Sequence, residues 1–429
     1  LPDYQLLEEK EDFLAKAGEK MQRLKALLPA ILCVFLLCGC FDDKEIDETA
    51  YIIAIGIDCA GESDYKYTFQ FSAPLAMSGG GDEGGSKKEV SDDDPDAIAD
   101  SGNPGVHNVI IKAADFYVAK NMLNNFLSKN IDMSHLKIIV FSPEVDRSGY
   151  VSHSQMFLHE REVRPHTCLA VAERSAEEFI RSVNPELEVN TAKYYELMSL
   201  RSNNVYAPVK MLRDFADSSG ETGKDAVLPI ARISKYKSSA EFSAGSAADS
   251  DSDWIEADGA KISSSRSDMR GMAVFRKQEP VGEMDDDSAL IYNILTHGIK
   301  KCTVSLKSAY SSRDTVSFRV SIPEAAHFKI EQSGGKYTIA VTAALNVEYM
   351  GGQLPSGYRS YDELFAQARS AFESKISDFL YATSRDFGAD ILDIGKSFRS
   401  GFSDWNSLCA VDWSSIYQAA DFSVDVRLL

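Results

Sequence analysis

The sequence predicts an α+β fold with several domains, in which mixed and antiparallel sheets are flanked by helices and the C-terminal domain contains a long helix. The first observation behind this prediction is size: 429 residues exceed one ordinary domain, and 44% hydrophobic residues suffice for several cores. The second is that runs with the two-residue period of strands and the 3.6-residue period of helices both recur. The third is that these runs do not alternate regularly as β-α-β units, which favours α+β.

The first apolar run has the length of a secretion signal. Met21 begins a short basic segment, and the run 26–37 has roughly a dozen residues where a spanning helix needs ~20. The Leu-Cys-Gly-Cys sequence at 37–40 resembles a bacterial lipobox. We therefore expect a signal peptide over 21–39 and covalent diacylglycerol on Cys40, with further acyl chains such as palmitate as the membrane anchor. An uncleaved anchor helix and a buried core helix are the alternatives.

Residues 1–20 do not fit a secretion signal. They contain six acidic and three basic residues and would place the basic segment inside the chain, whereas a signal acts at the very N-terminus. We therefore expect 1–20 to be a start-site artefact, with Met21 as the true start.

The chain is strongly acidic, with a formal net charge of −20. Such a surface repels phosphate groups, so no nucleic-acid partner is expected. The same charge argues against attachment to anionic lipid through basic patches. The membrane contact is therefore expected to come from the lipid on Cys40.

The N-terminal region, 41–242, is expected to begin with a β-hairpin. Tyr51–Ile57 has the composition of a buried strand, and aromatic residues at alternate positions of 65–71 mark its partner. The glycine- and aspartate-rich insert 77–105 cannot bury enough apolar surface to become ordered. The other expected elements are a helix over 113–127, strands over 136–141 and 168–172, and a helix over 176–183. A division of this region into two subdomains near residue 175 is left open.

An acidic, serine-rich linker over 243–258 is expected to lead into a C-terminal domain over 259–429. Ser360 has the position of an N-cap for a long helix over 361–387, which Gly388 would close. The expected strands cover 272–275, 302–306, 316–322, 328–330, 337–347 and 422–428, with a hairpin turn at Gly334-Gly335.

No motif for catalysis or metal binding is complete. His159-Glu160 begins like a zinc-protease helix, but Val163 stands where the second histidine belongs. A phosphate-loop spacing at 80–86 lacks its lysine, and an acidic alternation at 249–253 has Trp254 where a calcium loop needs glycine. We therefore expect a protein that is not an enzyme, with no catalytic residue, cofactor or metal ion.

Four cysteines lie beyond the signal and lipobox, at Cys59, Cys168, Cys302 and Cys409. They are widely spaced, and no C-x-x-C pair occurs, so neither a metal site nor a redox site is supported. We expect them to pack as small hydrophobic residues.

Several stretches in order along the chain together resemble one family. They are Gly39–Ile46 with Phe41 in place of a usual tryptophan, Ala54–Asp58, Ser134–Phe141, Phe157–Arg164 with His159 in place of arginine, Gly271–Gly282, Phe387–Asp390, Ile394-Gly395, Trp405 and Trp413. This pattern is similar to the Ger(x)C family, the lipoprotein C subunits of spore germinant receptors. Gly56, Gly271 and Gly282 are expected to serve turns and strand packing rather than contacts with a partner.

The resemblance implies a role and not a reaction. C subunits of this family assemble with two integral membrane proteins, a channel-like A subunit and a transporter-like B subunit that senses the nutrient, on the outer face of the spore inner membrane. We therefore expect a non-catalytic scaffold that binds no small molecule directly. The alternative is a lipid-anchored solute-binding protein of a transporter, a class that usually has two β-α-β lobes around a cleft.

Overall fold

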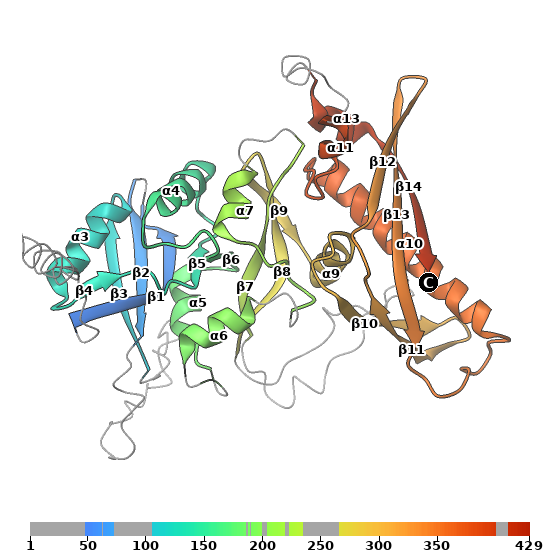
Figure 1. Ribbon diagram of the computed structural model, residues 1–429, viewed down its shortest axis with the longest axis horizontal. Helices are drawn as coiled ribbons and strands as arrows, with labels where there is room; N and C mark the ends of the chain where they lie inside the picture. Colours follow the sequence, from blue (N-terminus) through green and yellow to red (C-terminus); the bar gives the residue numbers. More distant parts are fainter. Residues whose placement is uncertain are drawn as a thin grey trace, which may run out of the picture. The chain divides into compact units, whose positions relative to one another are not determined.

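The computed structural model describes residues 48–61, 63–72, 105–185, 188, 190–199, 204–218, 223–234, 266–399 and 411–429 (Figure 1). Several sequence predictions lie outside these ranges: residues 1–20, the signal 21–39, Cys40, nearly all of the insert 77–105, the linker 243–258 and Cys409. From Ala50 onward the described elements belong to one compact unit. Within the described ranges, no helix combines the length and apolar character needed to cross a membrane.

The first sheet has nine strands. They are β1 (Thr49–Cys59), β2 (Tyr65–Ser72), β3 (Val106–Ala113), β4 (Asn130–Asp132), β5 (Ile138–Phe141), β6 (Cys168–Ala172), β7 (Val227–Ser234), β8 (Arg266–Arg276) and β9 (Glu279–Met284). Their order is β3-β2-β1-β5-β6-β7-β8-β9, and β4 pairs with β1. The predicted hairpin is confirmed, since β1 and β2 pair antiparallel, with Cys59 opposite Tyr65.

The centre of this sheet is parallel. Strands β1, β5, β6 and β7 run parallel to one another, whereas the strands on both sides pair antiparallel. Helices connect β5 to β6 and β6 to β7, so this part consists of β-α-β units, which the sequence pattern did not reveal. Both strands were expected, but helix α4 between them was not, because its buried face includes Gly149, His153 and Ser154 and therefore shows no clear apolar stripe.

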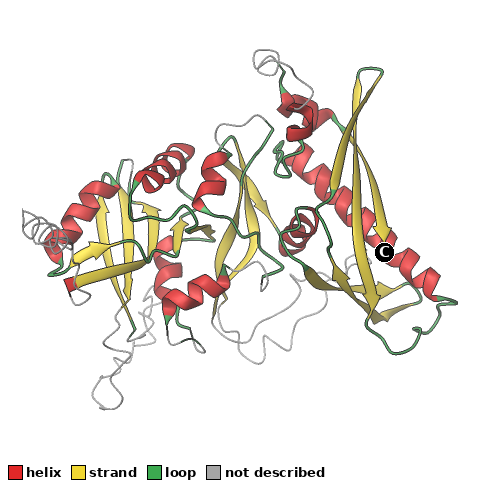
Figure 2. Cartoon of the chain, in the orientation of Figure 1, coloured by secondary structure: helices red, strands yellow, loops and turns green. Residues whose placement is uncertain are grey.

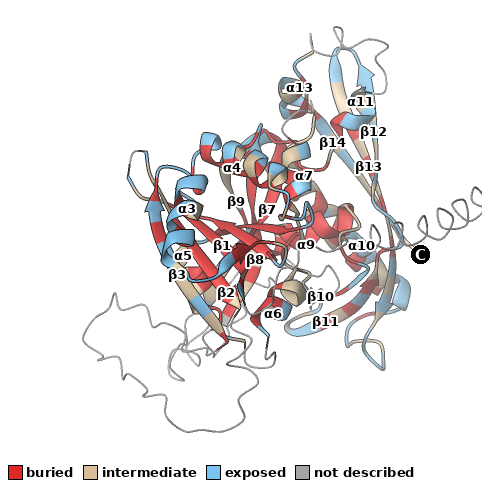
Figure 3. Ribbon diagram, turned by 60° about the vertical axis from the view of Figure 1, so that its left-hand side comes forward, coloured by how far each residue is buried: buried red, intermediate tan, exposed pale blue. Residues whose placement is uncertain are grey.

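Five helices of the described residues cover the first sheet. They are α3 (Phe116–Phe126), α4 (Arg147–His159), α5 (Ala176–Ser182), α6 (Thr191–Met198) and α7 (Leu212–Asp217). Apolar residues of α3, α4 and α7 share one core with the sheet, and those of α5 and α6 share another, so the two groups cover opposite faces. Figure 3 shows the central strands buried between these layers. Side chains of Asp115, Asp146, Ser175 and Asn190 cap the first turns of four of these helices.

The second sheet has five strands. They are β10 (Lys301–Ser308), β11 (Ser311–Ser321), β12 (His327–Ser333), β13 (Lys336–Tyr349) and β14 (Asp421–Leu428), in the order β10-β11-β13-β12 with β14 parallel to β13. The predicted hairpin turn is confirmed: Gly334 and Gly335 have φ values of 58° and 81° between the antiparallel strands β12 and β13. Two consecutive positive φ angles favour glycine and match the twist of a two-residue hairpin.

Helices flank the second sheet as well (Figure 2). They are α9 (Asp286–Leu295), α10 (Tyr361–Tyr381), a π-helical turn η3 (Ala382–Asp386), α11 (Gly395–Arg399) and α13 (Trp413–Ala419). The long helix starts where predicted, because the Ser360 side chain accepts a hydrogen bond from the Glu363 amide. It changes from α- to π-helical geometry after Tyr381, and Gly388 follows with φ 60°. Mixed and antiparallel sheets with flanking helices confirm the α+β class.

Candidate functional site

The predicted lipid attachment site, Cys40, lies outside the described residues, so that assignment stays a prediction. Cys168 and Cys302 pack in hydrophobic cores, as predicted, with 3% and 6% of their surface exposed. Burial raises the pKa of the Cys168 thiol to about 11 and that of Cys302 to about 12, so both stay protonated at neutral pH. Cys59 is only partly buried.

The zinc-protease near miss lies at the end of α4. His159 is the exposed last residue of α4, and its Nδ1 atom lies 2.7 Å from the Gln155 carbonyl oxygen. Glu160 accepts a hydrogen bond of 3.0 Å from Lys120, and Val163 packs in the core. Among the residues whose positions are described, no three His, Cys, Asp or Glu side chains are grouped to hold a metal ion. The 80–86 and 249–253 stretches lie outside the described ranges.

The three glycines of the family-like stretches serve packing, which confirms that prediction. A Cβ atom on Gly56 would lie 2.9 Å from Ile180 Cδ1, because α5 packs closely against β1 there. Gly271 has φ 73°, and its Cβ would lie 2.8 Å from a backbone carbonyl oxygen. A Cβ on Gly282, in β9, would lie 2.5 Å from the ring of Phe387, which belongs to another family-like stretch.

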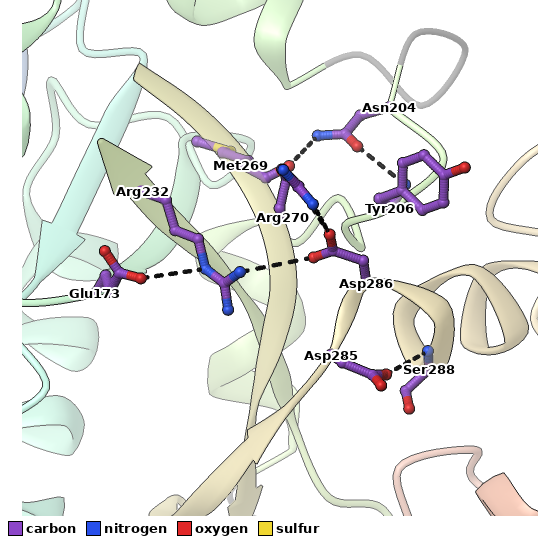
Figure 4. A network of polar contacts seen from close by, with 9 residues as sticks. All are labelled: Glu173, Asn204, Tyr206, Arg232, Met269, Arg270, Asp285, Asp286 and Ser288. Carbon is purple, nitrogen blue, oxygen red and sulfur yellow. Dashed lines mark hydrogen bonds and ion pairs between the residues drawn. The ribbon is translucent and has the colours of Figure 1, made fainter. Parts of the chain in front are cut away.

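Polar contacts concentrate where the first sheet meets α9, and Figure 4 shows them. Asp286, the first residue of α9, is fully buried and lies between two arginines. Its Oδ2 atom accepts hydrogen bonds from Arg270 Nε, at 2.8 Å, and from Arg270 Nη2, while its Oδ1 atom lies 3.8 Å from Arg232 Nη1. Arg232 Nε in turn lies 3.7 Å from Glu173 Oε1. We call Glu173, Arg232, Arg270 and Asp286 the Asp286 network.

The start of α9 explains why a carboxylate is tolerated there. Asp285 caps the helix by accepting a 2.8 Å hydrogen bond from the Ser288 amide, and Asp286 follows in the first turn, where the helix dipole favours negative charge. A buried carboxylate is nevertheless costly unless it is paired. Asp286 is paired fully through Oδ2, whereas Oδ1 accepts no hydrogen bond from the described residues. The two arginines therefore offset most of the free-energy cost of burying the Asp286 carboxylate.

A strap of chain over 204–207 is held between β8 and α9. Asn204 donates a 2.8 Å hydrogen bond to the Met269 carbonyl oxygen, and the Gly271 amide donates to Tyr206. On the other side, Asn293 donates 3.0 Å hydrogen bonds to the carbonyl oxygens on both sides of Tyr206. Because Asn293 is 2% exposed, these bonds are shielded from water and fix the strap to α9.

Asp390, in the chain that follows the long helix, has a second buried carboxylate. Asp390 accepts hydrogen bonds from the amides of Ile394 (3.0 Å) and Gly395 (2.7 Å) and from Trp413 Nε1 (2.9 Å). The backbones of Asp225 and Asp390 also bond, since the Asp225 amide donates to the Asp390 carbonyl oxygen at 2.9 Å. Burial outweighs these donors and raises the pKa of Asp390 to about 7. We call these five residues the Asp390 cluster.

A pocket of about 260 Å³ lies beside the Asp390 cluster. Its lining residues are Lys210, Asp214, Phe215, Ser218, Lys224, Asp225, Ala226, Val227, Tyr292, Thr296, Ile391, Leu392 and Asp393. The Lys210 ammonium group stands 5.1 Å from the centre of the Tyr292 ring, a cation–π contact that occupies one wall. The volume lies just under the ~300–1,000 Å³ typical of small-molecule sites. The pocket is thus polar and small.

His153 is a buried polar residue that the sequence did not single out. Its Nδ1 atom lies 2.7 Å from the Gly149 carbonyl oxygen, which can only accept, so Nδ1 carries the proton. Nε2 then accepts a 2.8 Å hydrogen bond from the Tyr67 hydroxyl group. Burial lowers the pKa of His153, so the neutral ring is the stable form. A lone histidine in α4 gives no sequence signal for this long-range contact with β2.

Two protein-family models match the chain. One, described as a spore germination protein N-terminal domain, matches residues 42–233. The other, described as spore germination B3/GerAC like, C-terminal, matches residues 270–428. The matches therefore include the Asp286 network and the Asp390 cluster.

Two curated relatives, both from Bacillus subtilis (strain 168), are similar to parts of the chain. A putative spore germination protein, YfkR, is 24% identical over 216 residues, 50% of each chain. Spore germination protein A3 is 24% identical over 173 residues, 40% of this chain and 41% of the relative. The chain thus spans half or less of the curated relatives it matches. A crystal structure of the GerBC protein aligns over 87% of this chain and 96% of that chain, with 13% identity and a TM-score of 0.47.

Proposed function

We propose, because this chain belongs to the Ger(x)C family of GerAC-like spore germination proteins, that it is the lipoprotein C subunit of a nutrient germinant receptor. In this proposal, lipid on Cys40 holds it at the outer face of the spore inner membrane. There it scaffolds the integral membrane A and B subunits and performs no catalysis. The observation that carries the proposal is that the two germination-family matches cover 42–233 and 270–428, most of the chain.

The scaffolding role is supported by how the family-like residues are used. Gly271, Gly282, Asp390 and Trp413 all make packing or hydrogen-bonding contacts inside the protein. They hold α9 and the long-helix region against the first sheet, so the family-like pattern specifies a shape. A subunit that positions two partners needs such a fixed shape more than it needs a reactive group.

The lipid anchor would give this scaffold its second property. Confinement to one membrane surface turns the encounter with an integral membrane partner into a nearly intramolecular event, with an effective concentration set by the tether. Even weak contacts with the A and B subunits would then be occupied. The anchor therefore explains how an acidic protein could stay with its partners without a large apolar interface.

Deletion of the gene tests the proposal directly. We expect the deletion strain to grow normally and to form spores that no longer germinate with the nutrient. We also expect chains that carry Cys40→Ser to leave the membrane fraction. Co-purification of A and B subunits with the wild-type chain from detergent-solubilised spore membranes checks the partners. Normal nutrient germination of the deletion spores would refute the proposal.

The solute-binding alternative has two observations in its favour, the parallel β-α-β centre of the first sheet and the 260 Å³ pocket. Against it, β8 pairs with β7, so the two family-matched regions share one sheet and have no simple hinge about which lobes could close. Calorimetry of the chain from Asp42 with candidate amino acids and sugars separates the two functions. Tight binding by this chain alone would favour the alternative, and no heat would favour the scaffold.

A further inference from the structure

Helix α3 carries an apolar stripe on its solvent side. Nine large hydrophobic side chains are exposed among the described residues, and four of them lie in this helix of 11 residues. Val118, Met122 and Phe126 are spaced four apart, so they form one row along the helix, with exposures of 44%, 50% and 70%. Figure 3 shows the outward face of α3 exposed. We call these three residues the α3 stripe.

The α3 stripe is separate from the face that holds the helix on the protein. Phe116, Ala119 and Leu123 are the buried residues of α3 and pack in the core of the first sheet. Removing the stripe would therefore leave the packing of α3 intact. A row of exposed apolar residues that the fold does not require points to an interaction surface.

The charge around the α3 stripe differs from that of the rest of the chain. No Asp or Glu occurs from Phe116 to Asn130, although the whole chain has 65 acidic residues and a net charge of −20. Two lysines, Lys120 and Lys129, occur in that stretch, and Lys120 is paired with Glu160. An anionic membrane would repel most of this protein, but it would not repel this segment.

The proposed lipid on Cys40 would hold the α3 stripe close to the membrane. From Cys40 to Ala50, where the compact unit begins, an extended chain reaches at most about 35 Å. Ala50 is the second residue of β1, and β1 pairs with β4. Strand β4 in turn begins three residues after the end of α3. The rings of Tyr51, near the start of β1, and His135, three residues after β4, have centroids 4.7 Å apart, so β4 lies beside the start of β1. The α3 stripe is thus at the end of the first sheet that a short anchor would hold at the bilayer.

We propose that the α3 stripe lies in the interface of the lipid bilayer to which the protein is anchored, with Phe126 and Met122 among the acyl chains just below the headgroups. The partner is a lipid surface containing anionic headgroups, and the inference rests on the proposed anchor at Cys40. Amphipathic helices bind such interfaces with the apolar side ~5–10 Å deep. The contact would fix the orientation of the anchored protein, which lipid on a single cysteine cannot do.

Quenching of tryptophan by brominated lipid tests this placement. The full chain with Phe126→Trp is expressed in a lipidating bacterial host and reconstituted into vesicles of phosphatidylcholine and phosphatidylglycerol with brominated acyl chains. The matched control is Tyr361→Trp, an aromatic position of 48% exposure at the start of α10. With the wild-type signal subtracted, we expect Trp at 126 to be quenched severalfold more than Trp at 361. Adding Met122→Asn to Phe126→Trp should remove most of that excess, because it breaks the row.

The outcomes separate this inference from the anchor. If Cys40→Ser is released from membranes but Trp at 126 is quenched no more than Trp at 361, the anchor stands and the docking of α3 is refuted. If Cys40→Ser stays bound and Trp at 126 is quenched, the anchor is refuted and the docking stands. If Trp at 126 becomes shielded from solvent only when A and B subunits are present, the partner is a protein and the lipid contact is refuted. If the fluorescence emission of Trp at 126 shifts to the blue with rising protein concentration and no lipid, the partner is a second copy of the chain, and the lipid contact is again refuted.

Discussion

Replacement of Asp286 by asparagine should destabilise the protein by about 2–3 kcal/mol. Removing one partner of a buried ion pair costs ~3–5 kcal/mol, because the charge left behind is poorly solvated. Here the carboxylate is fully buried, but the side chains of Arg270 and Arg232 keep 20% and 24% of their surface exposed. Water can therefore reach the orphaned guanidinium groups, which places the expected cost at or below the lower end of that range.

Asp285→Asn is the matched control for this change. It removes the same charge one residue earlier, at an exposed position where asparagine caps a helix as well as aspartate does. We expect it to change the free energy of unfolding by less than ~0.5 kcal/mol. Urea unfolding of the chain from Asp42, followed by circular dichroism, measures both variants through the midpoint and the slope.

A double-mutant cycle then tests the pairing itself. If Asp286 is stabilised by Arg270, the variant with both Asp286→Asn and Arg270→Gln should lose less stability than the sum of the two single variants. Equal losses for Asp286→Asn and Asp285→Asn, or strict additivity in the cycle, would show that the buried ion pair does not form as described.

Three further changes probe other buried contacts. Gly282→Ala places a Cβ 2.5 Å from the Phe387 ring and should cost ~1–3 kcal/mol, part of which Phe387→Leu should restore if the clash is the cause. Trp413→Phe removes the indole donor to the Asp390 carboxyl and should lower the free energy of unfolding by ~1.5–3 kcal/mol, whereas an unchanged thermal midpoint would contradict that hydrogen bond. The lowered pKa of His153 means that the unfolded chain takes up its proton first as pH falls. The stability that the neutral ring contributes is therefore present above the ordinary histidine pKa of ~6.5 and lost as pH drops through the folded value. Urea titrations between neutral and mildly acidic pH should show a steeper loss for the wild type than for His153→Gln, and parallel curves would argue against the buried neutral ring.

Elements that depend on local pattern could be predicted from the sequence. The β12–β13 hairpin follows from two adjacent glycines between alternating strands, and the start of α10 follows from Ser360 with two acids in the first turn. The boundary at Tyr381 could not be predicted, because the apolar spacing continues through Phe387 while the backbone changes to π-helical geometry. Local pattern records which face of an element is buried, but it does not record a change of helical pitch.

The contacts that unite the two family-matched regions could not be predicted. The backbone of Asp390 meets Asp225, 165 residues earlier in the chain, and no periodicity relates two such positions. Asp390 and Trp413 both lie in the family-like stretches, but nothing in their spacing indicates that the Trp413 indole donates to the Asp390 carboxylate. Asp286 was hidden for a different reason, because three consecutive aspartates at the start of a helix are the usual signature of an exposed first turn.

The pairing of β7 with β8 has a consequence for the order in which the protein is made. Strand β7 ends at Ser234 and its neighbour β8 begins at Arg266, so a growing or translocating chain presents β7 with an open edge until at least 32 more residues follow. The apolar sequence of β7 makes that open edge a template for pairing with other chains. Fragments that stop after β7 should therefore scatter more light than fragments that continue through β9, in which the edge of β7 is paired. A fragment that ends at the boundary between the two family-matched regions would therefore lack a strand of its own sheet.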